Sequence, residues 1–278
     1  MTLSVNTNHP ALIALQNLNR TNDEMTGVQT RINTGLSVSS AKDNAAVWSI
    51  AQGQRADRSA LAAVKMSLDR ATSVADVALA AGESVSDLLT VMREKVVAAK
   101  DSSLSTASRT ALNNDFQSLL KNLNQIVSSA KFDGANLLDG SMTSDIQFLA
   151  DADATSVITL TRQTLSLGGT INTLAATDSI ATQTMATAVL AKLDTSMAAV
   201  NQAVGSIGSQ AKQIEAHNVF VAKLSDVLET GVGNLVDADM AKESARLQAL
   251  QVKQQLGAQA LSIANSAPQI ILSLFKGG

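Results

Sequence analysis

Apolar residues recur along most of this chain at alternating spacings of three and four. The longest such row is unbroken, and only its glycine lacks an apolar side chain. This heptad pattern is typical of helices whose apolar edge packs against other helices. The row predicts one very long helix; its members are Leu61, Val64, Leu68, Ala71, Ala75, Ala78, Gly82, Val85, Leu89, Met92, Val96 and Ala99.

Two more rows of the same kind follow, one between residues 112 and 130 and one between 186 and 228. Since each row must be covered by other helices, the three together predict a rod of packed helices. The residues expected to form the core of this rod are Leu61, Val64, Leu68, Val85, Leu89, Met92, Leu119, Leu123, Ile126, Leu193, Val200, Val204, Ile207 and Ile214.

The two ends of the chain carry weaker rows. Asn8 and Pro10 are start signals for a helix near the N-terminus. Both terminal helices are rich in Gln, Asn and Ala and have few intrahelical charge pairs, so they are expected to be marginal until they pack on partners. We expect contacts with partners from Leu18, Met25, Ile32, Met240, Leu247, Leu250, Leu256, Leu261, Ile263 and Ile270.

The middle of the chain, residues 131–184, interrupts the helical pattern. Residues 146–150 and 157–161 read as two short strands joined by a polar turn, which predicts a β-hairpin. Serine and threonine are dense from residue 141 onward, so the hydroxyl-rich tip is a possible region of O-glycosylation. The hydroxyls singled out are Ser141, Thr143, Ser144, Thr155, Ser156, Thr164, Ser166, Thr170, Thr173 and Thr177.

Composition narrows the function. Aromatic residues make up only 2% of the chain, cysteine is absent, and the two prolines are Pro10 and Pro268, which leaves long helices unobstructed. A net charge of −3 without basic runs argues against nucleic acid or membrane partners. No secretory signal, catalytic motif or cofactor motif is visible, so we expect neither an enzyme nor a bound cofactor or metal.

Four segments resemble the bacterial flagellins. Residues 30–46, TRINTGLSVSSAKDNAA, are similar to the flagellin N-terminal signature, and residues 235–275 look like its C-terminal domain nearly end to end. Residues 130–140, AKFDGANLLDG, resemble the loop before the family's hairpin, and the predicted strands fill the hairpin position. The opening thirty or so residues are most similar to short alphaproteobacterial flagellins.

The resemblance implies a mainly α fold: a helical bundle rod with a small β-hairpin and paired terminal helices. Residues 1–40 and 235–278 would form the D0 domain of the filament's inner core, and residues 41–234 the D1 rod with its tip at about 131–184. It also implies that the partner contacts of the two terminal helices, listed above from Leu18 to Ile270, are polymerisation contacts. A further subunit contact is implied at Ala41, Lys42, Asp43 and Asn44.

The function that the resemblance implies is a structural subunit of the flagellar filament, secreted through the type III export apparatus. Expected partners are identical or related flagellins, the export apparatus, an export chaperone, and the filament cap and hook-junction proteins. A hook–filament junction protein of the same superfamily is the alternative.

Overall fold

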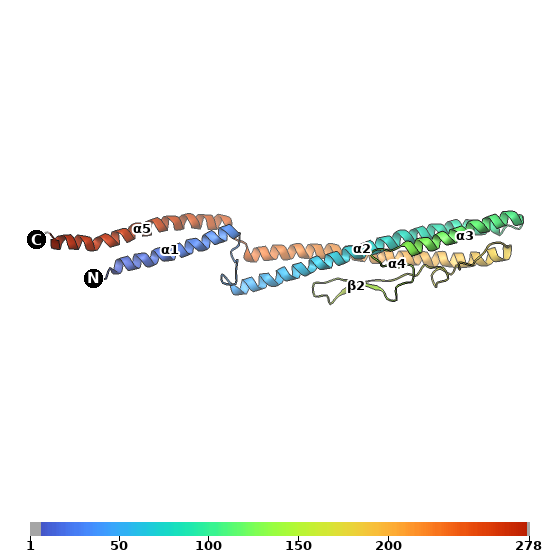
Figure 1. Cartoon of the computed structure of the whole chain (residues 1–278), viewed down its shortest axis with the longest axis horizontal. Helices are drawn as coiled ribbons and strands as arrows, with labels where there is room; N and C mark the ends of the chain where they lie inside the picture. Colours follow the sequence, from blue (N-terminus) through green and yellow to red (C-terminus); the bar gives the residue numbers. More distant parts are fainter. Residues whose placement is uncertain (1–6, 277–278) are drawn as a thin grey trace. The chain divides into compact units, whose positions relative to one another are not determined.

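The computed structural model describes residues 7–276, with the side chains of residues 7–266. It contains α1 (His9–Thr34), α2 (Ala45–Ala99), α3 (Thr106–Ser129), β1 (Ile146–Leu149), β2 (Val157–Leu160), α4 (Gln183–Val236) and α5 (Met240–Lys276), as Figure 1 shows. The mainly α fold with a small hairpin is confirmed. Among the described residues, no helix is both long and apolar enough to cross a membrane.

Side chains placed at the helix starts explain where these long helices begin. Asn8 and Asn44 accept from Ala11 N and Val47 N at the starts of α1 and α2. Ser105, Thr182 and Asp239 accept in the same way at the starts of α3, α4 and α5. Such a cap satisfies an amide that has no partner inside the helix and is worth about 1 kcal/mol.

The chain divides into two compact units. The terminal unit comprises residues 1–56 and 227–278, and the central unit comprises residues 57–226. The boundaries fall inside α2 and α4, whereas the D0 and D1 boundaries expected from the sequence lie near residues 40 and 235. Those sequence-based boundaries remain a prediction.

The core of the central unit lies along α2. All twelve positions of its row, Leu61 to Ala99, are buried. Gly82 lies against α4: a Cβ built on this glycine would be 2.7 Å from Cγ2 of Val204. The absence of a side chain at Gly82 therefore lets the two helices approach closely, and Val204 itself is half-buried.

Eleven of the fourteen predicted core residues are buried; Leu119, Ile126 and Val204 are half-buried instead. On α3 the buried positions are Leu120 and Val127, each one residue after the predicted one. Leu119–Leu120 and Ile126–Val127 are each two adjacent apolar residues, so the sequence pattern could not show which of the two is buried. The buried face of α3 consists of Phe116, Leu120, Leu123 and Val127. This spacing fits 3.6 residues per turn as well as the predicted spacing does.

The middle segment folds more compactly than its polar composition suggests. β1 and β2 pair antiparallel with Phe148 opposite Ile158, and both of these side chains are buried. The strands end one residue earlier than predicted, with Ala150 N donating to Ser156 O just beyond them. Outside the hairpin, Leu137, Leu138, Leu165, Leu174 and Ile180 are fully buried, so this segment helps to build the core of the central unit.

Candidate assembly surface

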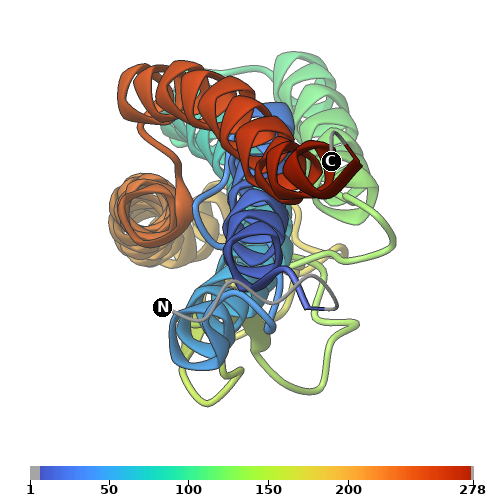
Figure 2. The same ribbon diagram turned by 90° about the vertical axis from the view of Figure 1, so that its left-hand side faces the viewer.

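The terminal unit brings α1 and α5 together along their length. Figure 1 shows the two helices next to each other, and Figure 2 views them nearly along their length. Val28 on α1 and Leu250 on α5 are buried in this pairing. Since the two helices come from opposite ends of the sequence, the pair joins the chain's two terminal regions in one element.

Polar contacts follow the pair from one end to the other. Arg31 and Glu243 form an ion pair at 3.0 Å. Gln254 Nε2 donates to Asn22 Oδ1 at 2.8 Å, and Asn8 Nδ2 donates to Ala264 O at 2.8 Å. These contacts mark one antiparallel alignment of the two helices, from the Arg31–Glu243 ion pair to the Asn8–Ala264 hydrogen bond.

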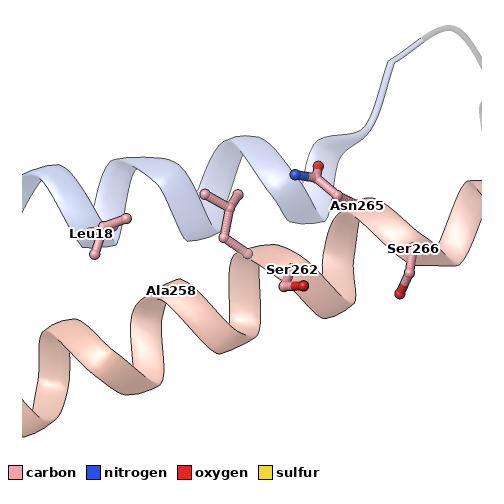
Figure 3. A pocket seen from close by; sticks show the side chains of 6 residues that line it. Leu18, Ala258, Ser262, Asn265 and Ser266 are labelled. Carbon is pink, nitrogen blue, oxygen red and sulfur yellow. The ribbon is translucent and has the colours of Figure 1, made fainter.

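Figure 3 shows a groove between α1 and α5, lined by Leu18, Ala258, Leu261, Ser262, Asn265 and Ser266. Asn265 points toward α1, whereas Ser266 points away from it. Gly257 admits Leu18 closely, because a Cβ built on the glycine would lie 3.3 Å from Leu18 Cδ1. Leu18 and Leu261 are therefore half-buried inside the chain's own helix pair.

The predicted polymerisation residues fall into two groups. Those that face the helix pair are half-buried, except Leu250, which is buried; they are Leu18, Met25, Ile32, Leu247, Leu250 and Leu261. Met240, Leu256 and Ile263 are exposed. Ile270 lies outside the residues whose side chains the structure describes.

Further exposed apolar residues on these helices were absent from the predicted set. They are Leu12, Ile13 and Leu15 on α1 and Val252 on α5. We refer to these four exposed residues together with Leu256 and Ile263 as the outer apolar face of the pair. Val252, Leu256 and Ile263 follow a helical repeat, so they lie along one side of α5. This regular spacing is visible in the sequence and could have identified Val252 as a member of the same apolar row.

The residues of the outer apolar face have largely exposed side chains. The side chain of Ile263 is 71% exposed, and those of Leu256 and Leu12 are each 59% exposed. Groups of large apolar side chains left in water mark surfaces that bind another protein, because their burial releases free energy in proportion to area.

The predicted contact turn before α2 is held by its own carboxylate. Ala41, Lys42, Asp43 and Asn44 are all exposed. Asp43 Oδ2 accepts from the hydroxyls and backbone amides of Ser39 and Ser40, between 2.9 and 3.2 Å. The hydroxyl bond from Ser39, followed by the amide bonds from Ser40 and Ser39, holds the pKa of Asp43 below its ordinary value. Asp43 and Asn44 thus have local structural roles, which leaves Ala41 and Lys42 available to a partner.

The ten hydroxyls of the middle segment are not equivalent. Thr155 bonds to Asp151, Ser166 to the carbonyl of Asp139, and Thr173 to the carbonyl of Lys192, while Thr164 is half-buried. The remaining six are exposed, and within the described part of the chain their hydroxyls make no hydrogen bond. These six are Ser141, Thr143, Ser144, Ser156, Thr170 and Thr177.

Both terminal regions of the chain match known protein-family sequences. Residues 5–143 match the bacterial flagellin N-terminal helical region, and residues 190–275 match the bacterial flagellin C-terminal helical region. These matches include α1 and most of α5, which carry the outer apolar face.

Curated relatives match over almost their whole length. Flagellin FljJ of Caulobacter vibrioides is 70% identical over 282 residues, covering 100% of both chains. Flagellin FljM of the same organism is 51% identical, with 98% of each chain covered. A flagellin of Brucella melitensis is 38% identical, with 99% of each chain covered.

Solved structures agree in fold. Bacillus cereus flagellin aligns with a TM-score of 0.50 and 22% identity, covering 55% of this chain and 87% of that one. A Vibrio parahaemolyticus protein described as flagellar hook-associated aligns with a TM-score of 0.59 and 14% identity, covering 70% of this chain and 100% of that one. At such identities the likeness shows the shared fold alone.

Proposed function

The chain belongs to the bacterial flagellin family and is a structural subunit of the flagellar filament, and from this premise we propose that it polymerises through the outer apolar face of α1 and α5. The relatives with high sequence identity are flagellins, and no observation favours the alternative of a hook–filament junction protein. The observation that carries the proposal is the exposure of Leu12, Leu256 and Ile263.

A second copy of the chain is the occupant that fits this face. A filament grows when one surface of a subunit binds a different surface of the next, which leaves the contact open to repetition. The chain's similarity to named flagellins supports polymerisation with related flagellins. Burying an Ile or Leu fully is worth about 1.5–3 kcal/mol, so several such residues supply a substantial part of the free energy of association. Ala41 and Lys42 add a second, exposed contact in this proposal.

The packing within the helix pair is looser in the half that lies farther from Thr34 and Met240. These are the ends of α1 and α5 that connect to α2 and α4, and we call this end of the pair the junction. The buried residues of the pair, Val28 and Leu250, and its ion pair lie in the half nearest the junction. Toward the other end, Leu12, Ile13 and Ile263 are exposed. We therefore expect the outer halves of α1 and α5 to open readily in the free subunit and to gain order on assembly.

Hydrogen exchange tests this proposal by comparing free subunits with filaments of the full chain. The amides of α1 and α5 should exchange at least about tenfold more slowly in the filament, since burial adds to the cost of local opening. Amides of α3 serve as the internal control and should change much less. Slower exchange confined to the central unit, with α1 and α5 unaffected, would place the assembly surface elsewhere.

The remaining parts of the proposal follow from family membership. We propose that the D0 domain, residues 1–40 with 235–278, forms the inner core of the filament and that residues 41–234 form D1. The chain would be secreted by the flagellar export apparatus with an export chaperone, and would meet the cap and hook-junction proteins at the filament ends. Its role would be structural, without catalysis.

Modification of the middle segment is a further part of the proposal. O-linked sugar should attach to the six exposed hydroxyls and leave Thr155, Ser166 and Thr173, because the latter three are engaged with their neighbours. Intact-mass measurement of native filaments should give more than the 28.8 kDa of the bare chain, and peptide mapping should locate the additions. A mass equal to that of the bare chain would contradict this modification.

A further inference from the structure

Two connecting segments of the chain pair with each other in the terminal unit. Gly35 to Val38 leaves α1, and Val236 to Ala238 connects α4 to α5. Ser37 N donates to Val236 O at 2.7 Å, and Ala238 N donates to Gly35 O at 2.8 Å. Leu36 and Asp237 pair as an antiparallel bridge. We call this pairing of residues 35–38 with 236–238 the clasp.

The clasp rests on a small apolar base. Ala51, Val232 and Val236 are buried there, and Leu36, Val38 and Val47 pack against them. Gly35 ends α1 with a φ of +71°, a left-handed conformation that glycine adopts without strain. This backbone turn directs the chain from the last residue of α1 into the clasp. The clasp is thus tied to the ends of α2 and α4 as well as to α1 and α5.

The helix pair needs such a fixed point because its own pattern repeats. Leu18, Met25 and Ile32 recur every seven residues on α1, and Leu247 and Leu261 lie on one such row of α5. Sliding one helix by seven residues, about 10.5 Å, would bring equivalent positions opposite one another again. The two polar contacts Asn22–Gln254 and Asn8–Ala264 lie at partly buried positions, where water can replace a lost partner.

We propose that the clasp sets the register of α1 against α5. Its backbone hydrogen bonds join the segment that follows α1 to the segment that precedes α5. Only one alignment of the two helices is therefore compatible with these bonds. The register marked by Arg31–Glu243, the contact nearest the clasp, continues to Asn8–Ala264 at the other end. This inference concerns pairing within one chain and does not depend on which surface polymerises.

Disulfide trapping tests the proposal, and the chain has no cysteine of its own to interfere. A Cβ built on Gly257 lies 3.9 Å from Leu18 Cβ, within the range for a disulfide. Leu18→Cys with Gly257→Cys therefore reports the observed register. Leu18→Cys with Ala264→Cys reports a slip of seven residues. Both pairs are oxidised in the full-length chain at dilution, and the intramolecular disulfide is quantified by non-reducing gel and peptide mass spectrometry.

With the clasp intact, the observed-register disulfide should form and the slipped one should be scarce. Ser37→Pro removes the nearer of the two amides that bond to Val236 O and leaves that of Val38 at 3.4 Å, and Ala238→Pro removes the amide that bonds to Gly35 O. Each should raise the ratio of slipped to observed disulfide by about tenfold, as expected for the loss of one or two backbone hydrogen bonds. Ser37→Ala keeps the backbone amide and loses only the hydroxyl hydrogen bond to Val236 O at 3.2 Å, so it should change the ratio much less than Ser37→Pro.

Three results would overturn the proposal. The first is an unchanged ratio in both proline variants. The second is abundant slipped disulfide with the clasp intact. The third is a fall in both disulfides, which would mean that the clasp holds the helices together without choosing their alignment. Filament growth is not part of the readout, so failure here is separate from failure of the proposed assembly surface.

Discussion

Replacing Ile263 with aspartate should stop filament growth and leave the melting temperature of the free subunit unchanged. The side chain is 71% exposed in the free chain, so the subunit loses little packing when it is replaced. On the proposed surface, the same position is buried against a neighbour, where an unpaired carboxylate costs several kcal/mol unless it is protonated. Every added subunit incurs that cost, so elongation from seeds should fail.

Seeded growth followed by light scattering and electron microscopy measures the first effect, and thermal circular dichroism measures the second. Ile263→Leu preserves the apolar contact and should grow filaments normally. Normal filaments from Ile263→Asp would remove this residue from the assembly surface. A large loss of melting temperature would show that it stabilises the free subunit instead.

Leu89→Asp should have the opposite effect and destabilise the free subunit severely. Leu89 is fully buried in the core of the central unit. The substitution loses about 1.5–3 kcal/mol of apolar burial and places a carboxylate in a closely packed core, so a total above about 4 kcal/mol is expected. Chemical denaturation monitored by circular dichroism measures this change in the free energy of unfolding.

The neighbouring residue provides a matched control. Thr90 is exposed on the same turn of α2, where it donates a hydroxyl hydrogen bond to Ser86 O. Thr90→Asp adds the same charge outside the core and should change stability by about 0.5 kcal/mol or less. Comparable losses at Leu89 and Thr90 would contradict the assignment of the Leu61–Ala99 row as the core.

The long helices and their buried rows could be predicted because their signal is repeated many times. Every position of the row on α2 is buried as the heptad spacing predicts. The prediction was less accurate on α3, where Leu119–Leu120 and Ile126–Val127 offer two apolar choices each. Three-dimensional packing selects between such neighbours, and the periodicity of one sequence contains no information about it.

The assembly surface could be predicted only in part, for a related physical reason. The rows of α1 and α5 show that these helices have apolar faces, but a row does not say which partner covers it. Leu18 and Leu261 turn out to face each other's helix, whereas Ile263 faces outward. The clasp has no heptad signal at all, since backbone hydrogen bonds join residues such as Ser37 and Val236, which lie far apart in the chain.

The hydroxyl-rich middle shows a similar limit. Its composition indicates a solvent-exposed segment, yet Leu165, Leu174 and Ile180 are fully buried within it. Asn172 is buried as well, with its side-chain amide donating to Leu165 O. Buried side chains of this kind are scattered without a period, so sequence spacing does not reveal them.

A density map of the filament at side-chain resolution tests the proposed assembly surface. We expect Leu12, Leu256 and Ile263 to be buried against neighbouring copies of the chain, with α1 and α5 paired so that Arg31 lies beside Glu243 and Asn8 beside Ala264. A map in which these three side chains face solvent while the filament is held together by other surfaces would contradict this expectation.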